Sequence, residues 1–97
     1  MFKVKINYDV LEIDHIVEFI QDNTLFAAAR ENGNGHLRIF LINASTGNVY
    51  TRNGRVDSWE QLYGSERYGV IARLLHARNS NTPVFKINGT SAEYQAA

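Results

Sequence analysis

The sequence predicts an α+β fold: a two-layer domain in which a largely antiparallel sheet of four to five strands is covered on one face by helices. Two observations lead to this prediction. Stretches that alternate apolar and polar residues recur along the chain and are separated by short turns rich in Asn and Gly. A helical period of apolar residues then appears between residues 57 and 78. Strands joined by short hairpins are antiparallel, so we expect the helices to gather on one face.

Residues 1–97 form a single predicted domain, since 97 residues is close to the usual size of one. Hydrophobic residues make up 44% of the chain, which is enough to build a core. Ten basic and ten acidic residues cancel, which argues against binding nucleic acid by bulk charge. The absence of Cys excludes disulfides, thiolate catalysis and cysteine zinc sites. We find no signal peptide or membrane-length apolar run, and so expect a soluble cytoplasmic protein without a membrane partner.

The N-terminal part of the chain contains one clear element and one ambiguous one. Residues 2–8 alternate with period two and predict a strand with one buried face. Residues 10–22 carry apolar residues at three- and four-residue steps, which is typical of a helix, although many of them are β-branched and would suit a strand. We favour a short helix for this segment.

A β-meander is predicted next, with a tight Asn-Gly turn at residues 32–35 after its first strand. The near-continuous apolar run at residues 39–42 indicates a central strand that is covered on both faces. Residues 52–55 indicate a further turn or a bulge at a strand end. The three strands of the meander are expected at residues 25–30, 36–42 and 48–51.

The longest predicted helix starts where Asp57 or Ser58 can cap it, with Glu60-Gln61 in the first turn as in a capping box. We expect it to be one helix, or two pieces that meet near Gly64. Its expected anchors on the sheet are Trp59 and Leu74.

The chain after this helix is predicted to hold one more strand. Residues 79–83 end in Pro and should stop the helix. Residues 84–87 are apolar and predict a short final strand. Residues 90–97 are expected to form a frayed tail.

The sequence offers little that resembles catalytic chemistry. The three His residues stand alone, without a second His at helical spacing. No Ser lies in a nucleophile elbow, and the glycines at residues 33 and 35 precede a strand rather than a helix that could receive a phosphate. We therefore predict a protein that is not an enzyme and that uses no metal and no cofactor.

Candidate partner-binding residues are the tyrosines and arginines of the long helix and two acidic residues of the early segment. Interleaved Arg and Tyr are typical of single-strand nucleic-acid binders, but Glu residues share the helix, so nucleic acid is the less favoured partner. Tyrosines suit a protein interface, and an acidic early segment with a more basic later half suits a charged partner or a second copy. The predicted set is Tyr63, Arg67, Tyr68, Arg73, Arg78, Asp14 and Glu18.

One stretch points to a known family. Val56-Asp57-Ser58-Trp59-Glu60-Gln61-Leu62, after a strand and an Asn-Gly turn, resembles the entry to the C-terminal helix of small phage-encoded anti-CRISPR proteins. One such inhibitor of type I CRISPR surveillance complexes combines a small antiparallel sheet with a helix that is entered through a similar stretch. The resemblance implies a compact, cofactor-free protein that occupies a surface on a larger host machine.

The expected function is therefore that of a small non-enzymatic interaction protein. Its most specific form is a phage or mobile-element inhibitor that binds a host defence protein or ribonucleoprotein by steric occlusion. One alternative is an RNA- or DNA-binding module that uses the helix arginines. A second alternative is a self-assembling structural subunit of a virion, or a homodimer, because the edges of a short sheet can pair with another copy.

Overall fold

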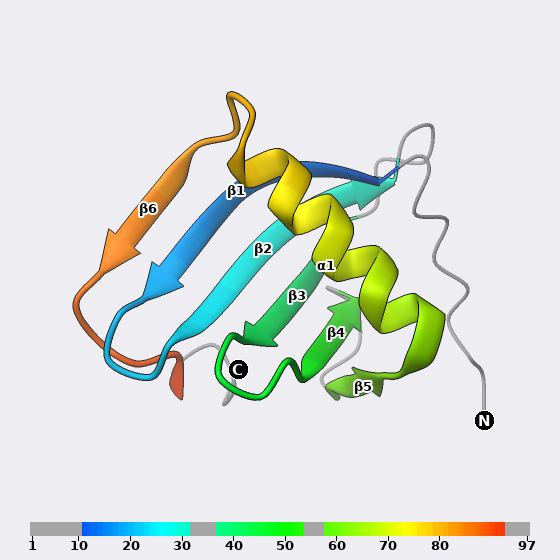
Figure 1. The fold of residues 1–97 in the computed structure, drawn as a ribbon, viewed down its shortest axis with the longest axis horizontal. Coiled ribbons are helices and arrows are strands. Elements are labelled where there is room, and N and C mark those ends of the chain that lie inside the picture. Colours follow the sequence, from blue (N-terminus) through cyan, green and yellow to red (C-terminus); the bar gives the residue numbers. More distant parts are fainter. Residues whose placement is uncertain (1–10, 32–36, 54–57, 93–97) are drawn as a thin grey trace.

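The computed structural model describes residues 11–31, 37–53 and 58–92. The strand predicted at residues 2–8, the turn at 32–35 and the end of the tail at 93–97 lie outside the described residues. The elements follow one another along the chain as drawn in Figure 1. They are β1 (Leu11–Phe19), β2 (Thr24–Glu31), β3 (Leu37–Asn43), β4 (Val49–Asn53), β5 (Glu60–Leu62), α1 (Gly64–Arg78) and β6 (Val84–Ile87).

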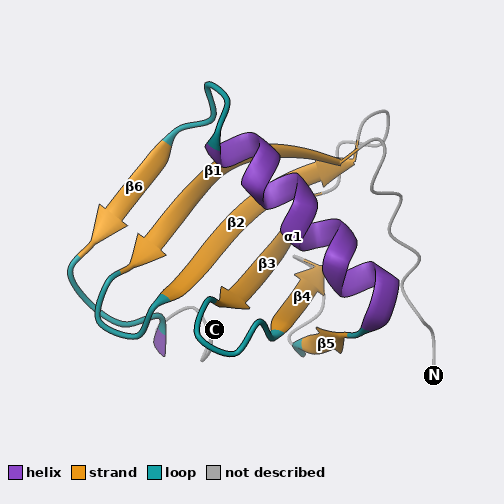
Figure 2. Ribbon diagram, in the orientation of Figure 1, coloured by secondary structure: helices purple, strands orange, loops and turns teal. Residues whose placement is uncertain are grey.

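The strands form one sheet in the order β5-β4-β3-β2-β1-β6, and α1 crosses one face of it diagonally (Figures 1 and 2). The α+β class and the helix layer are confirmed. Among the described residues the sheet has six strands rather than the four to five predicted. It is largely antiparallel, as predicted, but one parallel pair of strands makes it mixed. Neighbouring strands are antiparallel except for β6, which runs parallel to β1. The reason is that α1 returns the chain across the sheet before β6, and such a crossover allows parallel pairing.

The prediction of a short helix at residues 10–22 is wrong, because this segment forms β1 and the turn that follows it. The pairing of β1 with β2 shifts register between Ile13 and His15, which leaves Asp14 as the extra residue of a bulge. Ile13 and Ile16 therefore both join the core under α1, although they are three positions apart in the sequence. A bulge in a strand has produced the three-residue spacing that a helix would also give.

The start of the long helix is also predicted wrongly. Residues 60–62 form β5, where Leu62 lies opposite Val49 and is buried. The helix begins at Gly64, whose φ of 57° lies in the left-handed region that side chains with a Cβ disfavour. Tyr63 occupies the N-cap position with an extended backbone, so Ser58 does not cap α1, and Asp57 lies outside the described residues.

The main core lies between α1 and the sheet. Phe40 on β3 is completely buried there, beneath Val70 and Leu74 of the helix. Leu74 is thus an anchor of the helix, as predicted. Ala27 and Ala29 on β2 belong to the same cluster, and their small side chains allow the helix to pack closely over the middle of the sheet.

A second apolar cluster lies on the opposite face of the sheet, because successive residues of a strand point to opposite faces. Trp59, predicted as a helix anchor, packs against this cluster instead, so that prediction is wrong. Its other partly buried members are Ile39 and Tyr50. The buried members are Val17, Phe19, Phe26, Ala28 and Leu41.

The chain after β6 is fastened to the turn between β1 and β2. Asp22 Oδ2 accepts hydrogen bonds from the backbone N–H of Ser91 at 2.9 Å and from its hydroxyl at 2.7 Å. Ser91 is fully buried, and the backbone N–H of Gln21 donates to the carbonyl of Gly89 at 3.1 Å. Of the segment predicted to fray, residues 90–92 are described, and Ser91 ties them to the sheet.

Acid should weaken this fastening. Burial raises the pKa of the Asp22 carboxyl, but hydrogen bonds from the backbone N–H and the hydroxyl of Ser91 outweigh it and lower the pKa overall. A carboxyl with a lowered folded-state pKa stabilises the fold above its unfolded pKa, and that stabilisation is lost as the pH falls through the folded pKa.

We expect Asp22→Asn to be less stable than the wild type at neutral pH, by about 1–2 kcal/mol for hydrogen bonds to a charged group. The difference should begin to shrink below about pH 4, the ordinary pKa of an unfolded Asp, and should disappear as the pH falls through the lowered folded-state pKa. Urea denaturation at several pH values measures this, with Asn88→Asp, an exposed change outside the fastening, as the control. A difference that stays constant from neutral pH to acid would contradict the role assigned to Asp22.

Candidate functional site

The structure places the helix residues of the predicted site on different sides of α1. Tyr63 and Tyr68 are exposed, at 69% and 63%. Tyr63 precedes the helix, and its hydroxyl donates a hydrogen bond to Gln61 Oε1 at 2.9 Å. Tyr68 lies on the solvent side of α1, where Leu75 is also exposed at 50%. Leu75 was not in the predicted set, although its place two turns after Tyr68 could have indicated it.

We define the outer face of α1 as the stripe of residues that points away from the sheet. At about 3.6 residues per turn, this stripe lies opposite Val70, Leu74 and Ala77, which are the buried residues of the helix. It consists of Ser65, Tyr68, Gly69, Ala72, Leu75 and His76. No Lys, Arg, Asp or Glu belongs to it.

The three arginines of the predicted site flank this stripe and make contacts within the protein. The guanidinium carbon of Arg67 lies 4.8 Å from the ring centroid of Tyr68, a cation–π geometry. Arg78 Nη2 lies 2.6 Å from Glu18 Oε1. Arg73 is half-buried and also has a partner within the protein. The arginines therefore do not form one free basic row along the helix.

The two acidic residues of the predicted set lie apart on β1. Asp14 is the extra residue of the bulge, and Glu18 lies near the end of the strand. Glu18 faces α1, and its side chain is only 14% exposed where it meets Arg78. The contact is close but not aligned as a hydrogen bond, so it is an ionic contact near the C-terminal end of α1. Asp14 pairs instead with Arg30 of β2, whose Nε lies 3.0 Å from its Oδ2. Of the predicted site residues, Glu18 and Arg78 are thus brought together, and Asp14 is elsewhere.

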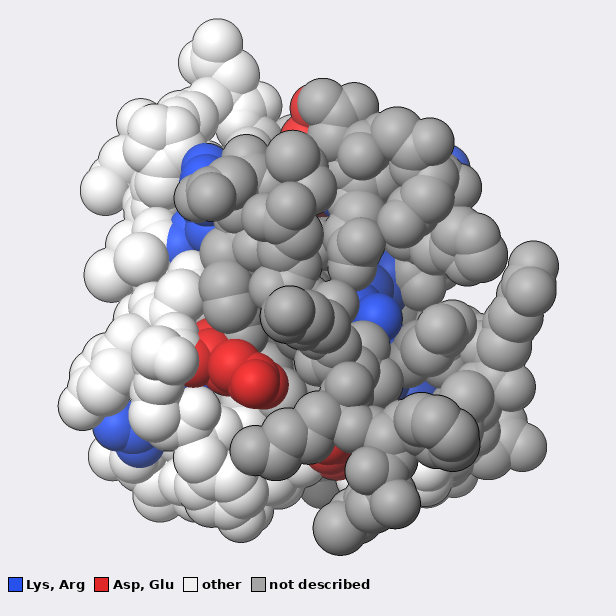
Figure 3. Space-filling model, turned by 90° about the vertical axis from the view of Figure 1, so that its right-hand side faces the viewer, with Lys and Arg blue, Asp and Glu red and all other residues white. Residues whose placement is uncertain are grey.

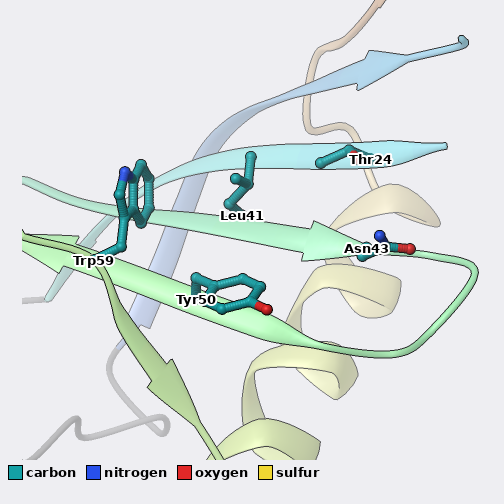
Figure 4. Close-up of a pocket in the computed structure, with 5 residues that line it drawn as sticks. All are labelled: Thr24, Leu41, Asn43, Tyr50 and Trp59. Carbon is teal, nitrogen blue, oxygen red and sulfur yellow. The ribbon is translucent and has the colours of Figure 1, made fainter. Parts of the chain in front are cut away.

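A hollow that the sequence did not indicate lies on the face of the sheet opposite α1 (Figure 4). Its volume is about 470 Å³, within the range of small-molecule sites. We call it the Trp59 hollow. Leu41 forms its floor, Trp59 stands at one end, and the Tyr50 hydroxyl points toward the other end, where Asn43 lies. It is lined by Thr24, Leu41, Asn43, Tyr50 and Trp59.

The aromatic and polar groups of the hollow are held in place by their neighbours. The guanidinium carbon of Arg52 lies 5.0 Å from the ring centroid of Trp59 and fixes the indole from outside the lining. Asn43 Oδ1 accepts hydrogen bonds from the backbone N–H groups of Ser45 at 2.9 Å and Thr46 at 3.2 Å. The amide of Asn43 is thereby oriented, and its NH₂ group remains as a donor.

The described residues hold no arrangement that indicates catalysis or metal binding. Within residues 11–31, 37–53 and 58–92, no three His, Asp or Glu side chains come together as metal ligands would. No helix in these segments is long and apolar enough to span a membrane. Seen from the right-hand side of Figure 1, blue and red side chains of the described residues are interspersed rather than gathered by sign (Figure 3).

Comparison with known proteins gives no significant match: no protein family, no curated protein and no solved structure corresponds to this chain. The function of the chain is therefore inferred from the surfaces just described.

Proposed function

We propose that this chain is a small non-enzymatic interaction protein and that the outer face of α1 is the surface on which a protein partner docks. The observation that carries the proposal is the exposure of Tyr68 and Leu75 on a helix face that has no Lys, Arg, Asp or Glu. The solvent side of a surface helix is normally charged or polar. Aromatic side chains and a depletion of charge are typical of the centre of a protein interface.

The local structure of this face suits a docking role. Arg67 stacks on Tyr68 and restricts its ring, so that less side-chain entropy is lost when a partner covers it. Gly69 and Ala72 are small and lie between the two large side chains, which allows a partner to approach the helix closely. Tyr is also among the residues that contribute most to binding when they are buried at an interface.

The more specific form of the proposal is a phage or mobile-element inhibitor that blocks a host defence protein or ribonucleoprotein by steric occlusion in the host cytoplasm. Residues 56–62 resemble the stretch that enters the helix of anti-CRISPR proteins. In this protein, however, residues 60–62 form the strand β5 and not the start of a helix. The inhibitor proposal is therefore supported by the compact fold, and by a docking face that contains no Lys, Arg, Asp or Glu, more than by residues 56–62.

The alternative of a nucleic-acid partner is less well supported by the geometry. Binding to phosphates needs several cations that can reach the strand together. Arg78 is paired with Glu18, Arg67 is stacked on Tyr68, and the outer face between them carries no Lys or Arg. A protein partner accounts for the exposed aromatic and aliphatic side chains without requiring free cations.

A homodimer is the second candidate, because a specific feature of the sheet edge favours it. β6 is an edge strand on which Phe85 is 55% and Ile87 42% exposed, next to Ile20 at 59%. Edge strands with exposed apolar residues can pair with another copy. Light scattering over a wide concentration range tests this candidate, and a constant monomer mass excludes it.

The docking face is tested with the double variant Tyr68→Glu/Leu75→Glu. We expect the wild type to retain a protein at stoichiometric amount from lysates of bacteria that carry CRISPR systems. The double variant should lose at least about 100-fold in affinity, since two interface anchors are replaced by charges. The measurement is a pull-down followed by titration with the purified captured protein.

The matched control adds the same two charges elsewhere. Asn81→Glu/Asn88→Glu changes two exposed residues of the loops on either side of β6. It should bind like the wild type, and circular dichroism should show that both variants fold. Equal binding by the two double variants would refute the docking role of α1.

A further inference from the structure

We propose that the Trp59 hollow is a binding site for a single nucleobase-type ring, that is, a planar nitrogen heterocycle with carbonyl or ring-nitrogen acceptors on one edge. The site is independent of the docking face, because the two lie on opposite faces of the sheet. Its ligand is a free nucleoside or one base of a single strand, and the experiment below distinguishes these sources.

The indole of Trp59 gives the hollow a surface on which a planar ring can stack. The indole of Trp59 stands at one end of the hollow and Leu41 lies beside it (Figure 4). Arg52 lies over the indole at 5.0 Å and is not part of the lining, so the indole is fixed while the hollow stays open. Aromatic side chains stack on nucleobases because every base has a π-face.

The opposite end of the hollow carries polar groups that can form hydrogen bonds with the edge of such a ring. Because Asn43 Oδ1 is occupied by the backbone of Ser45 and Thr46, its NH₂ group is the part of the amide left to meet a ligand. Tyr50 contributes a hydroxyl that can donate or accept. Thr24 lies at the same end, and its hydroxyl donates to the carbonyl of Asp22 at 3.3 Å, which leaves its oxygen as an acceptor.

A hollow with an aromatic surface at one end and hydrogen-bonding groups at the other discriminates between classes of ring. A purely apolar ring would displace water from Asn43 and Tyr50 and leave them without hydrogen bonds. A pyranose can also lay its C–H face on Trp59, but its hydroxyls surround the whole ring, whereas the polar groups of the hollow lie at one end only. A nucleobase has apolar faces and a polar edge, and thus matches both ends of the hollow. None of the lining residues that the structure describes is ionised at neutral pH, which favours a neutral ring.

Trp59 is the only Trp of the chain, so its fluorescence reports directly on the hollow. The full-length protein is titrated with uridine, cytidine, adenosine and guanosine, with excitation at the red edge of Trp absorption. We expect saturable quenching by at least one nucleoside below about 10 mM, an affinity reasonable for one small ring. N-acetylglucosamine and N-acetylphenylalaninamide should give no saturable change.

A matching oligonucleotide distinguishes the two sources of the base. If it binds at least tenfold tighter than the nucleoside, the base belongs to a single strand. If the two affinities are equal, the ligand is a free nucleoside.

Two conservative variants separate binding from folding. Tyr50→Phe removes a hydroxyl from the hollow, whereas Tyr63→Phe removes one from an exposed residue outside it. Tyr50→Phe should weaken nucleoside binding about three- to tenfold, as the loss of one hydrogen bond does. Tyr63→Phe should bind like the wild type. The proposal is overturned if no nucleoside gives saturable quenching, if the sugar or the phenylalanine amide binds equally well, or if the two variants bind alike. None of these results would affect the docking face of α1.

Discussion

Replacing Phe40 by Ala should remove about half of the stability of this protein. Phe40 is completely buried at the centre of the sheet and packs under α1 with Val70 and Leu74. A Phe→Ala change in a core costs about 3–5 kcal/mol, because the transfer free energy of the ring is lost and a cavity remains. A domain of this size has only about 5–10 kcal/mol of stability in total.

Denaturation by urea, followed by far-UV circular dichroism, measures this loss. The matched control is Phe85→Ala, which makes the same change at a Phe that is 55% exposed on β6. The control should lose less than about 1 kcal/mol, as is usual for surface substitutions. If both variants lost the same free energy of unfolding, Phe40 would not lie in the core under the helix.

The change Val70→Asp should detach α1 from the sheet or unfold the chain. Val70 is 1% exposed on the inner side of the helix, among the apolar side chains of the main cluster. A carboxylate buried there without a partner costs at least about 3 kcal/mol. The matched control is Ala72→Asp, which places the same residue on the outer face of the same helix, where it is exposed.

Thermal melting and amide hydrogen exchange distinguish the two Asp variants. Val70→Asp should lose cooperative melting or the exchange protection of residues 64–78. Ala72→Asp should lose less than about 1 kcal/mol, which is the scale of a helix-propensity change at an exposed position. Equal losses would show that the helix does not pack on the sheet through the side that holds Val70.

Local patterns predicted most of the elements. The strands β2 and β3, the final strand at residues 84–87 and the stop of the helix at Asn79 all follow from short apolar runs and the turn residues between them, and the structure confirms them. The strand β4 extends further than predicted, from Val49 to Asn53, and residues 54–55 of the turn or bulge expected at 52–55 lie outside the described residues.

The errors arise where distant residues override a local pattern. The bulge at Asp14 exists only because β1 pairs with β2, and it produces a helix-like spacing of Ile13 and Ile16 that the sequence alone cannot resolve. Good capping chemistry before residue 62 indicated a helix, but Leu62 gains more by pairing beside Val49 and joining the core. The parallel pairing of β6 with β1 joins the two ends of the described chain, which no local signal predicts.

For the candidate sites too, local patterns predicted what lies on one element, and contacts between distant strands were missed. Tyr68 was predicted from its place on a helix among arginines, and the helix indeed exposes it. The Trp59 hollow was missed, because its five residues come from β2, β3, β4 and the segment before β5. Only the order of the strands in the sheet brings Thr24 and Trp59 to the same surface.

The most direct test of the docking face is site-specific photocrosslinking in host lysate, with p-benzoylphenylalanine in place of Tyr68 and, in a parallel sample, in place of Phe85. We predict one covalent adduct with a host protein from position 68, which excess wild-type protein suppresses and the variant Tyr68→Glu/Leu75→Glu does not. Position 85 should give no such adduct. Adducts from position 85 alone, or an adduct at position 68 that both competitors suppress equally, would contradict a partner docked on the outer face of α1.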